Sequence, residues 1–188
     1  MAKPTKNNVS VGKPMATGGV FRAPAGTTVP TDATTPLGEE FANLGYVSED
    51  GVTNAVETDS EDVTAWGGDT VLTVQTSRSE TFTFTLIESL NEDVLKAVFG
   101  DVNVTGGTVK HNSLERAEAV WVFEILLTGN HIRRIVVPAG KVTEVGETKY
   151  VDGEPLGYEV TLAALPDDSG NTAYEYTAVI GSSSDYGA

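Results

Sequence analysis

The side chains that could carry out chemistry are few, and their spacing does not form a catalytic arrangement. The chain has two histidines, His111 and His131, and no cysteine. His111 lies in a polar turn sequence and His131 follows a hairpin turn, which favours surface positions over acid–base catalysis. Paired carboxylates such as Asp167 and Asp168 lie among turn-forming residues, where Asp side chains bond to their own backbone.

The motifs that would support these groups are missing from the sequence. There is no serine in a G-x-S-x-G turn, no glycine loop with phosphate-binding spacing and no histidine pair with metal-ligand spacing. A glycan-cleaving enzyme would need its paired carboxylates beside a cluster of aromatic side chains, which the sequence does not offer. We therefore expect no enzyme activity, no catalytic residues, no metal and no cofactor.

The acidic stretch 57–69 is the best candidate for binding a cation. Its carboxylates are separated by small polar residues, and carboxylate oxygens suit calcium. The spacing nevertheless lacks the central glycine and the final bidentate glutamate of a calcium-binding loop. We expect a loop here, either solvated or in contact with another subunit through Trp66. An acidic all-β binding module of the adhesin type, dependent on calcium through 57–69 or 167–171, is the alternative function.

Charge distinguishes the two ends of the chain. The formal net charge of −15 argues against a conventional nucleic-acid-binding protein, because phosphate contacts need clustered Lys and Arg. Four bases nevertheless precede the first acid, Asp32. A basic N-terminal arm rich in Pro and Gly could dock onto the acidic body of a neighbouring subunit, or could be a solvated terminus. No apolar run is long enough for a signal sequence or a membrane span, so we expect a soluble protein without a membrane partner.

The longest alternating pattern runs from Val71 to Ile87. Leu72, Val74, Phe82, Phe84 and Leu86 fall on one parity and short polar residues on the other, which is the period of a strand with one solvated face. Ser77–Ser79 is a poor hairpin turn, although a turn there is the alternative. One continuous strand would span roughly 55 Å at ~3.3 Å per residue, far more than an ordinary strand. Such a strand would project beyond its own domain and suggests completion by other copies.

The rest of the chain reads as strands with one helix. Residues 89–100 predict an amphipathic helix with a capping box from Ser89 to Glu92, an apolar face that includes Leu90, and Gly100 at its end. The predicted strands are Ala42–Val47, Val52–Val56, Ala119–Thr128, Ile132–Val137 ending at Pro138, Val142–Val145, Thr148–Val151, Tyr158–Leu165 and Tyr174–Ile180. We expect a mainly β protein, a sandwich or barrel with one flanking helix.

Arg133 and Arg134 are adjacent in a predicted strand. Consecutive strand residues point to opposite faces of a sheet, so one arginine should face inward or toward a partner. Either both heads reach solvent from an edge strand or a bulge, or one forms an intersubunit ion pair with the acidic surface of another copy.

The order of these features resembles the major tail tube protein of a long, non-contractile bacteriophage tail, of the kind found in phages of actinobacteria. The resemblance is carried by RAPAGTTVPTD (22–32), LGYVSEDGVT (44–53), AWGGD (65–69), TFTLIESLNEDVLKAVFG (83–100), RRIVVPAGKVTEVGE (133–147) and GYEVTLAALPDDSGNT (157–172).

The resemblance implies a β-sandwich of the tail tube type that assembles into hexameric rings. The rings stack into a tube through which phage DNA passes at ejection, in a virion tail assembled in the host cytoplasm. Implied partners are further copies of the chain and the tape measure, tail terminator and distal tail proteins. By position, residues 1–38 are an extended arm, 39–181 the tube domain with an inter-ring loop at 57–77 and a helix at 89–100, and 182–188 a flexible tail.

Two sets of residues follow from these expectations. Contacts between subunits or rings are predicted for Lys3, Lys6, Lys13, Phe21, Arg22, Asp59, Glu61, Asp62, Trp66, Arg133 and Arg134. Six copies would carry about −90 formal charge, and a negative wall would repel DNA phosphates so that the genome slides without adhering. The face of the predicted strand Val71–Ile87 that carries short polar side chains is expected to line the lumen, through Thr73, Gln75, Thr81, Thr83 and Thr85.

Overall fold

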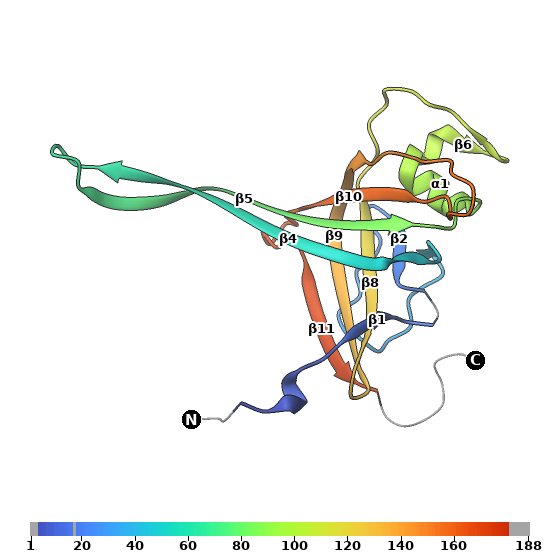
Figure 1. Cartoon of the computed structure of the whole chain (residues 1–188), viewed down its shortest axis with the longest axis horizontal. Helices are drawn as coiled ribbons and strands as arrows, with labels where there is room; N and C mark the ends of the chain where they lie inside the picture. The colour runs from blue at the N-terminus through green and yellow to red at the C-terminus, as the bar shows by residue number, and fades with distance from the viewer. Residues whose placement is uncertain (1–3, 17, 181–188) are drawn as a thin grey trace.

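The fold is a mainly antiparallel β structure with one α-helix (Figure 1). The computed structural model describes residues 4–16 and 18–180. The strands are β1 (Gly12–Pro14), β2 (Val20–Pro24), β3 (Ala42–Asn43), β4 (Val47–Thr64), β5 (Thr70–Leu86), β6 (Val104–Thr105), β7 (Thr108–Val109), β8 (Ala119–Leu127), β9 (His131–Val145), β10 (Tyr158–Leu165) and β11 (Tyr174–Val179). Two 3-10 turns, Lys6–Asn8 and Asp101–Asn103, and helix α1 (Glu92–Phe99) complete the elements.

The large sheet has the order β3-β2-β8-β9-β10-β5-β4, with β1 also pairing with β8 and β11 with β9. Strand β9 organises it, because its first part pairs with β11 and its second part with β10. The pairing of β9 with β8 shifts register near Pro138, between Val137 and Gly140. Such an irregularity accommodates a proline, which cannot donate a ladder hydrogen bond. The strand therefore continues through Pro138, and the predicted end at that residue is wrong.

The change of partner along β9 curls the sheet so that β5 faces β8. Phe82 stacks on Phe123 with ring centroids 5.1 Å apart, and Phe84 lies 6.0 Å from the ring of Trp121. Since β5 and β8 are not neighbours in the sheet, these contacts join two layers, as in a sandwich. The predicted fold class, mainly β with one flanking helix, is confirmed.

Strand β8 is buried on both sides over its first six residues, which explains why it is apolar at every position except Glu124. One side of it faces the core with β5, and the other packs Val120 and Val122 against Phe21 of β2. Strands β1 and β2 both pair with β8. The segment that the sequence suggested as an arm therefore contributes two strands to the sheet.

Helix α1 closes one end of the core through Val94, Ala97 and Val98. It begins later than predicted, because the side chain of Asn91, not Ser89, caps it by accepting a hydrogen bond from the Asp93 amide. Leu90 consequently precedes the helix and is 95% exposed, so its predicted place on the apolar face is wrong. The helix end at Gly100, which has a positive φ of 96°, is confirmed.

Three further expectations about elements were wrong. Residues 42–56 do not form two short strands, because β4 runs unbroken from Val47 and absorbs residues 48–51 as an irregularity between Val47 and Val52. Most of the predicted loop 57–69 also belongs to β4. Residues 148–151 form no strand; Tyr150 and Val151 are 82% and 52% exposed, so the burial that their apolar pattern assumed is absent.

Candidate assembly surface

The largest feature outside the core is the hairpin of β4 and β5. The two strands pair from Val47 and Leu86 at the root to Thr64 and Thr70 at the far end. The tip, residues 65–69, closes with hydrogen bonds from the Ala65 amide to the Asp69 carbonyl and from the Gly68 amide to the Ala65 carbonyl, 2.8 and 3.0 Å long. The prediction of one continuous strand through Ser77–Ser79 is confirmed.

Most of this hairpin projects beyond the rest of the sheet (Figure 1). Strand β10 pairs with β5 only between Thr81 and Leu86. Residues 80–86 of β5 alternate between buried and partly buried, whereas residues 70–79 are all exposed. A projecting strand pair with no covering layer is marginally stable by itself in water, which indicates that it is completed by another surface.

A register shift in the hairpin changes which residues share a face. Asp59 lies opposite Ser77, but the next residue, Ser60, lies opposite Gln75, so Thr76 is left without a partner. Because cross-strand partners share a face and successive strand residues alternate, Ser77 and Gln75 lie on opposite faces. The alternation therefore does not run straight along β5, and Thr73 and Gln75 do not share one face with Thr81, Thr83 and Thr85.

The distal hairpin carries an exposed apolar patch, which we define as Val63, Leu72 and Val74. Val63 lies opposite Leu72, and the three side chains are 48%, 56% and 44% exposed. Trp66 at the tip is fully exposed. Two polar pairs lie beside the patch: the hydroxyl of Ser77 donates to Asp59 and that of Thr73 to Asp62. An apolar patch rimmed by polar groups marks an interaction surface.

Asp59 and Asp62, predicted as contact residues, thus lie on the hairpin and bind hydroxyls of its own second strand. Glu61 lies opposite Val74, beside the apolar patch. Among the described residues, no group of three or more Asp, Glu or His side chains is placed to hold a metal ion.

Glu80 lies buried where the hairpin leaves the sheet. It accepts hydrogen bonds from Asn54 Nδ2 at 3.0 Å, Arg78 at 2.9 Å and the hydroxyl of Thr172. Arg78 also donates to Thr172 Oγ1 at 3.0 Å. Burial raises the pKa of Glu80, but the hydrogen bonds from Thr172, Asn54 and Arg78 outweigh it and hold that pKa below its ordinary value. This cluster, the root clamp, ties both hairpin strands to the segment before β11.

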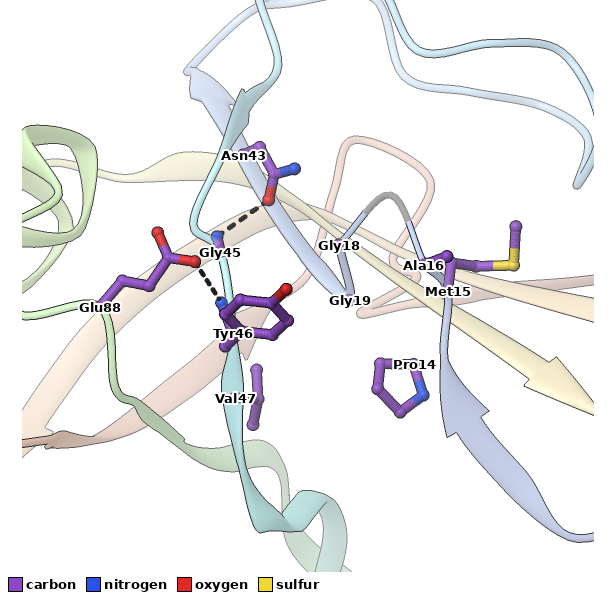
Figure 2. Close-up of a pocket in the computed structure, with 10 residues that line it drawn as sticks. All are labelled: Pro14, Met15, Ala16, Gly18, Gly19, Asn43, Gly45, Tyr46, Val47 and Glu88. Atoms are coloured by element: carbon purple, nitrogen blue, oxygen red, sulfur yellow. Dashed lines mark hydrogen bonds between the residues drawn. The ribbon is translucent and has the colours of Figure 1, made fainter. Parts of the chain in front are cut away.

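An open pocket of about 470 Å³ lies at the root of the hairpin (Figure 2). Its walls come from Pro14, Met15, Ala16, Gly18, Gly19, Asn43, Gly45, Tyr46, Val47 and Glu88. Glu88 Oε1 accepts the Tyr46 amide at 3.0 Å, and Asn43 Oδ1 accepts the Gly45 amide at 2.8 Å. A side chain at Gly45 would collide with Glu88, since an added Cβ would lie 2.0 Å from its Cδ. We call this the root pocket.

The two adjacent arginines point to opposite faces, as expected. Arg134 is buried and forms an ion pair with buried Glu124, and it donates to the carbonyls of Asp32 and Thr35 at 2.9 and 2.8 Å. The partner predicted on another subunit is therefore a residue of the same chain. Arg133 reaches the surface and lies 3.5 Å from Glu175.

The remaining predicted contact residues are spread over the molecule. Arg22 pairs with Asp101 of the same chain at 2.6 Å, a contact that lowers the pKa of Asp101. Phe21 packs against Val120 and Val122 in the core. Lys6 and Lys13 are exposed, and Lys3 lies outside the described residues, as does the predicted tail 182–188. Within the described part of the chain, no helix is long and apolar enough to span a membrane.

The root clamp, the root pocket and the role of Glu124 were not predicted from the sequence. A signal existed for Glu80, which falls on the buried parity of β5 with Phe82 and Phe84. Charge at such a position indicates a partner. The pocket had no comparable signal, because its walls come from three segments far apart in the sequence.

Comparisons with known proteins bear on the whole chain. A family model described as phage tail tube protein matches residues 4–179. Among solved structures, sixteen chains match, one of them from the cryo-EM structure of the anti-feeding prophage cap, the AFP tube terminating cap. It is 12% identical, with a TM-score of 0.43, over 91% of this chain and 96% of that one. No curated protein matches the chain.

Proposed function

Because this chain belongs to the phage tail tube protein family, with a structural role in the phage tail, we propose that it is the tube subunit of a long, non-contractile tail. In this proposal the chain forms hexameric rings that stack into a hollow tube, and the tube serves as the conduit for DNA. The tape measure, tail terminator and distal tail proteins are its other partners, and assembly takes place in the host cytoplasm. The proposed role requires no catalysis, metal or cofactor.

The observation that carries this proposal is the projecting hairpin. Val63, Leu72, Val74 and Trp66 are exposed at the end of a long strand pair, where they do not stabilise a monomer. The unpaired edges of the two strands also favour association with another chain. Stacked rings would cover these side chains. We therefore assign contacts between rings to residues 57–77, and to exposed Lys6 and Lys13 at the N-terminal end.

Residues Thr81, Thr83 and Thr85 support a lumen face. They share one side of β5, opposite to Phe82 and Phe84, and pair with Ala163, Thr161 and Glu159 of β10, respectively. The same face also carries exposed Glu159 and, opposite Ala163, Lys141, which is paired with Glu115 at 2.8 Å. In a ring of chains of net charge −15, short threonine side chains beside a carboxylate and an ion-paired lysine would offer DNA phosphates little positive charge to bind.

Lysine substitutions test the lumen assignment. Thr81→Lys with Thr83→Lys should slow DNA ejection, because each added cation binds phosphate along the path. The matched control is the double variant with glutamine at the same positions. Normal ejection through intact tubes by the lysine variant would remove the lumen assignment.

Negative-stain microscopy of the purified protein tests the function itself. Hollow tubes or rings with sixfold symmetry are expected as the concentration rises. Monodisperse monomers at high concentration, in the presence or absence of a chelator, would count against the proposal.

A further inference from the structure

We propose that Trp66 at the hairpin tip of one copy inserts into the root pocket of the next copy, with the indole N–H donating to Glu88. This inference rests on the proposed self-assembly and names the residues of one contact within it. The partner is a second copy of this chain.

The first argument is the exposure of Trp66. Its side chain is fully exposed at the tip of a hairpin, whereas Trp121, the other tryptophan, is 1% exposed in the core. Tryptophan offers a large apolar surface and an N–H donor, and it is enriched at the centres of protein interfaces. The hairpin tip therefore presents a tryptophan that is not packed against its own chain.

The second argument is the chemistry of the root pocket. Tyr46, whose ring is exposed, and Val47 lie on one side of the pocket and Pro14 on the other, where they offer aromatic and apolar contacts; Gly18 and Gly19 lie between the two sides (Figure 2). Its volume of about 470 Å³ lies within the ~300–1,000 Å³ of pockets that hold small organic groups.

Glu88 supplies the acceptor that a buried indole N–H needs. Its Oε1 accepts from the Tyr46 amide at 3.0 Å and its Oε2 from Asn91 Nδ2 at 3.2 Å, which fix the carboxylate in place. Each carboxylate oxygen has a further lone pair, so the group can accept a third hydrogen bond.

The third argument is the placement of anchor and pocket. Tyr46 and Val47 lie at the start of β4 and Glu88 follows β5, so the pocket is at the root of the hairpin and Trp66 is at its far end. At ~3.3 Å per residue, the 17 residues of β5 separate them by roughly 55 Å. Trp66 therefore cannot reach the pocket of its own chain. A contact between two different surfaces at opposite ends of a molecule propagates from copy to copy and builds an open assembly.

Disulfide trapping tests this contact directly, because the chain contains no cysteine. The variant Trp66→Cys with Tyr46→Cys, assembled and then oxidised, should give a ladder of covalent multimers on a non-reducing gel. A ladder is expected because each chain carries one tip and one pocket, and a disulfide requires Cα atoms within ~7 Å. Trp66→Cys alone should run as a single monomer band on the same gel, and the control Trp66→Cys with Tyr150→Cys uses another exposed tyrosine, which does not line the pocket.

The outcomes separate this inference from the proposed function. Tubes in the microscope with no more cross-linking than in the Tyr150 control would overturn the contact and leave the tube subunit in place. A ladder without tubes or rings would support the contact and overturn the tube. Dimers from Trp66→Cys alone would mean that tips meet tips, which also overturns the contact.

A second measurement avoids changing Trp66. Since Trp121 stays buried, a shift of the fluorescence emission to shorter wavelength on assembly reports the burial of Trp66. We expect that shift in the wild type, and Tyr46→Ala should raise the concentration needed for assembly about tenfold, in the range of an interface hot spot. Tyr150→Ala should leave it unchanged. An unshifted emission in assembled tubes would contradict the inference.

Discussion

Glu80 is the residue that fixes the hairpin to the body. Its carboxylate accepts hydrogen bonds from Asn54 of β4, Arg78 of β5 and Thr172 before β11, so one side chain links both hairpin strands to a third segment. A buried carboxylate with three donors stabilises this geometry only while it is ionised.

Substituting Glu80 with glutamine should lower the free energy of unfolding by about 1–3 kcal/mol at pH 7, because donors around a buried acceptor lose their charged partner. The folded-state pKa of Glu80 lies below its ordinary value of 4.5, so its contribution is present above that value and is lost as pH falls through the lowered pKa. Urea denaturation of both proteins across this range measures the effect. Glu144→Gln, an exposed control, should differ from wild type by less than about 0.5 kcal/mol, and a pH-independent Glu80→Gln effect would contradict the assignment.

Arg134 and Glu124 form the most buried ion pair of the described chain, at 3% and 7% side-chain exposure. The arginine also satisfies two carbonyls of the segment before β3. This pair fastens residues 32–35 onto the sheet and explains why a charged residue follows Arg133 in a buried strand.

Replacing Arg134 with methionine should cost about 3–5 kcal/mol, because Glu124 is left charged and unpaired in the interior. The double variant Arg134→Met with Glu124→Leu should lose less than the single one. Arg133→Met, which removes a half-exposed ion pair, should cost no more than about 1 kcal/mol. Chemical denaturation gives all three values, and equal losses at positions 133 and 134 would be incompatible with this account.

At the scale of elements, the β4–β5 hairpin combines a structural half and a projecting half. Its root is paired with β10 and buries Phe82, Phe84 and Leu86, whereas its distal half buries no large side chain within the chain. Removal of the distal half should therefore separate folding from assembly.

Replacing residues 59–77 with Asn-Gly should leave a folded subunit that cannot form tubes. Thr58 and Arg78 lie opposite each other, Asn-Gly suits a two-residue hairpin turn, and the root clamp is retained. The unfolding free energy should change by about 1 kcal/mol or less, since only exposed residues are removed. Circular dichroism and negative-stain microscopy measure the two effects. Tubes built from the shortened chain would exclude the hairpin as an assembly element.

At the scale of the whole molecule, charge opposes self-association. Each copy carries a formal charge of −15, and described acids such as Asp59 and Asp62 lie on the same hairpin that exposes the apolar patch. Copies must therefore approach against repulsion before apolar contacts form.

Raising the ionic strength should accelerate assembly. The screening length falls from about 30 Å at 0.01 M to about 8 Å at 0.15 M, so repulsion between approaching copies weakens while apolar contacts persist. Light scattering after a salt jump measures the rate, with sucrose at matched osmolarity as the control. Dissolution of tubes by salt would show instead that ion pairs between subunits dominate.

Local patterns in the sequence were sufficient to predict the strands β8, β10 and β11, the approximate position of helix α1 and the continuity of β5. Each depends on side-chain period and turn residues within a few positions, such as Gly129 and Asn130, both at positive φ. The family resemblance rested on six segments between residues 22 and 172, and the family match over residues 4–179 agrees with its broader part, a phage tail tube protein.

Tertiary structure alone decided the features that depend on which segments meet. The register shift next to Asp59 places the polar residues of β5 before and after it on opposite faces of the hairpin. The sequence of β5 alone does not reveal this shift, because the shift depends on how β5 pairs with β4. Arg134 finds Glu124 only because β8 and β9 pair, and Glu80 finds Thr172 across 92 residues of chain. The root pocket likewise exists only where the segment from Pro14 to Gly19, the segment from Asn43 to Val47 and Glu88 meet. The alternation of side chains along one strand can be read from the sequence, because it depends only on neighbouring residues. Which residues each face of the strand contacts depends on strand pairing and packing, which only the tertiary structure determines.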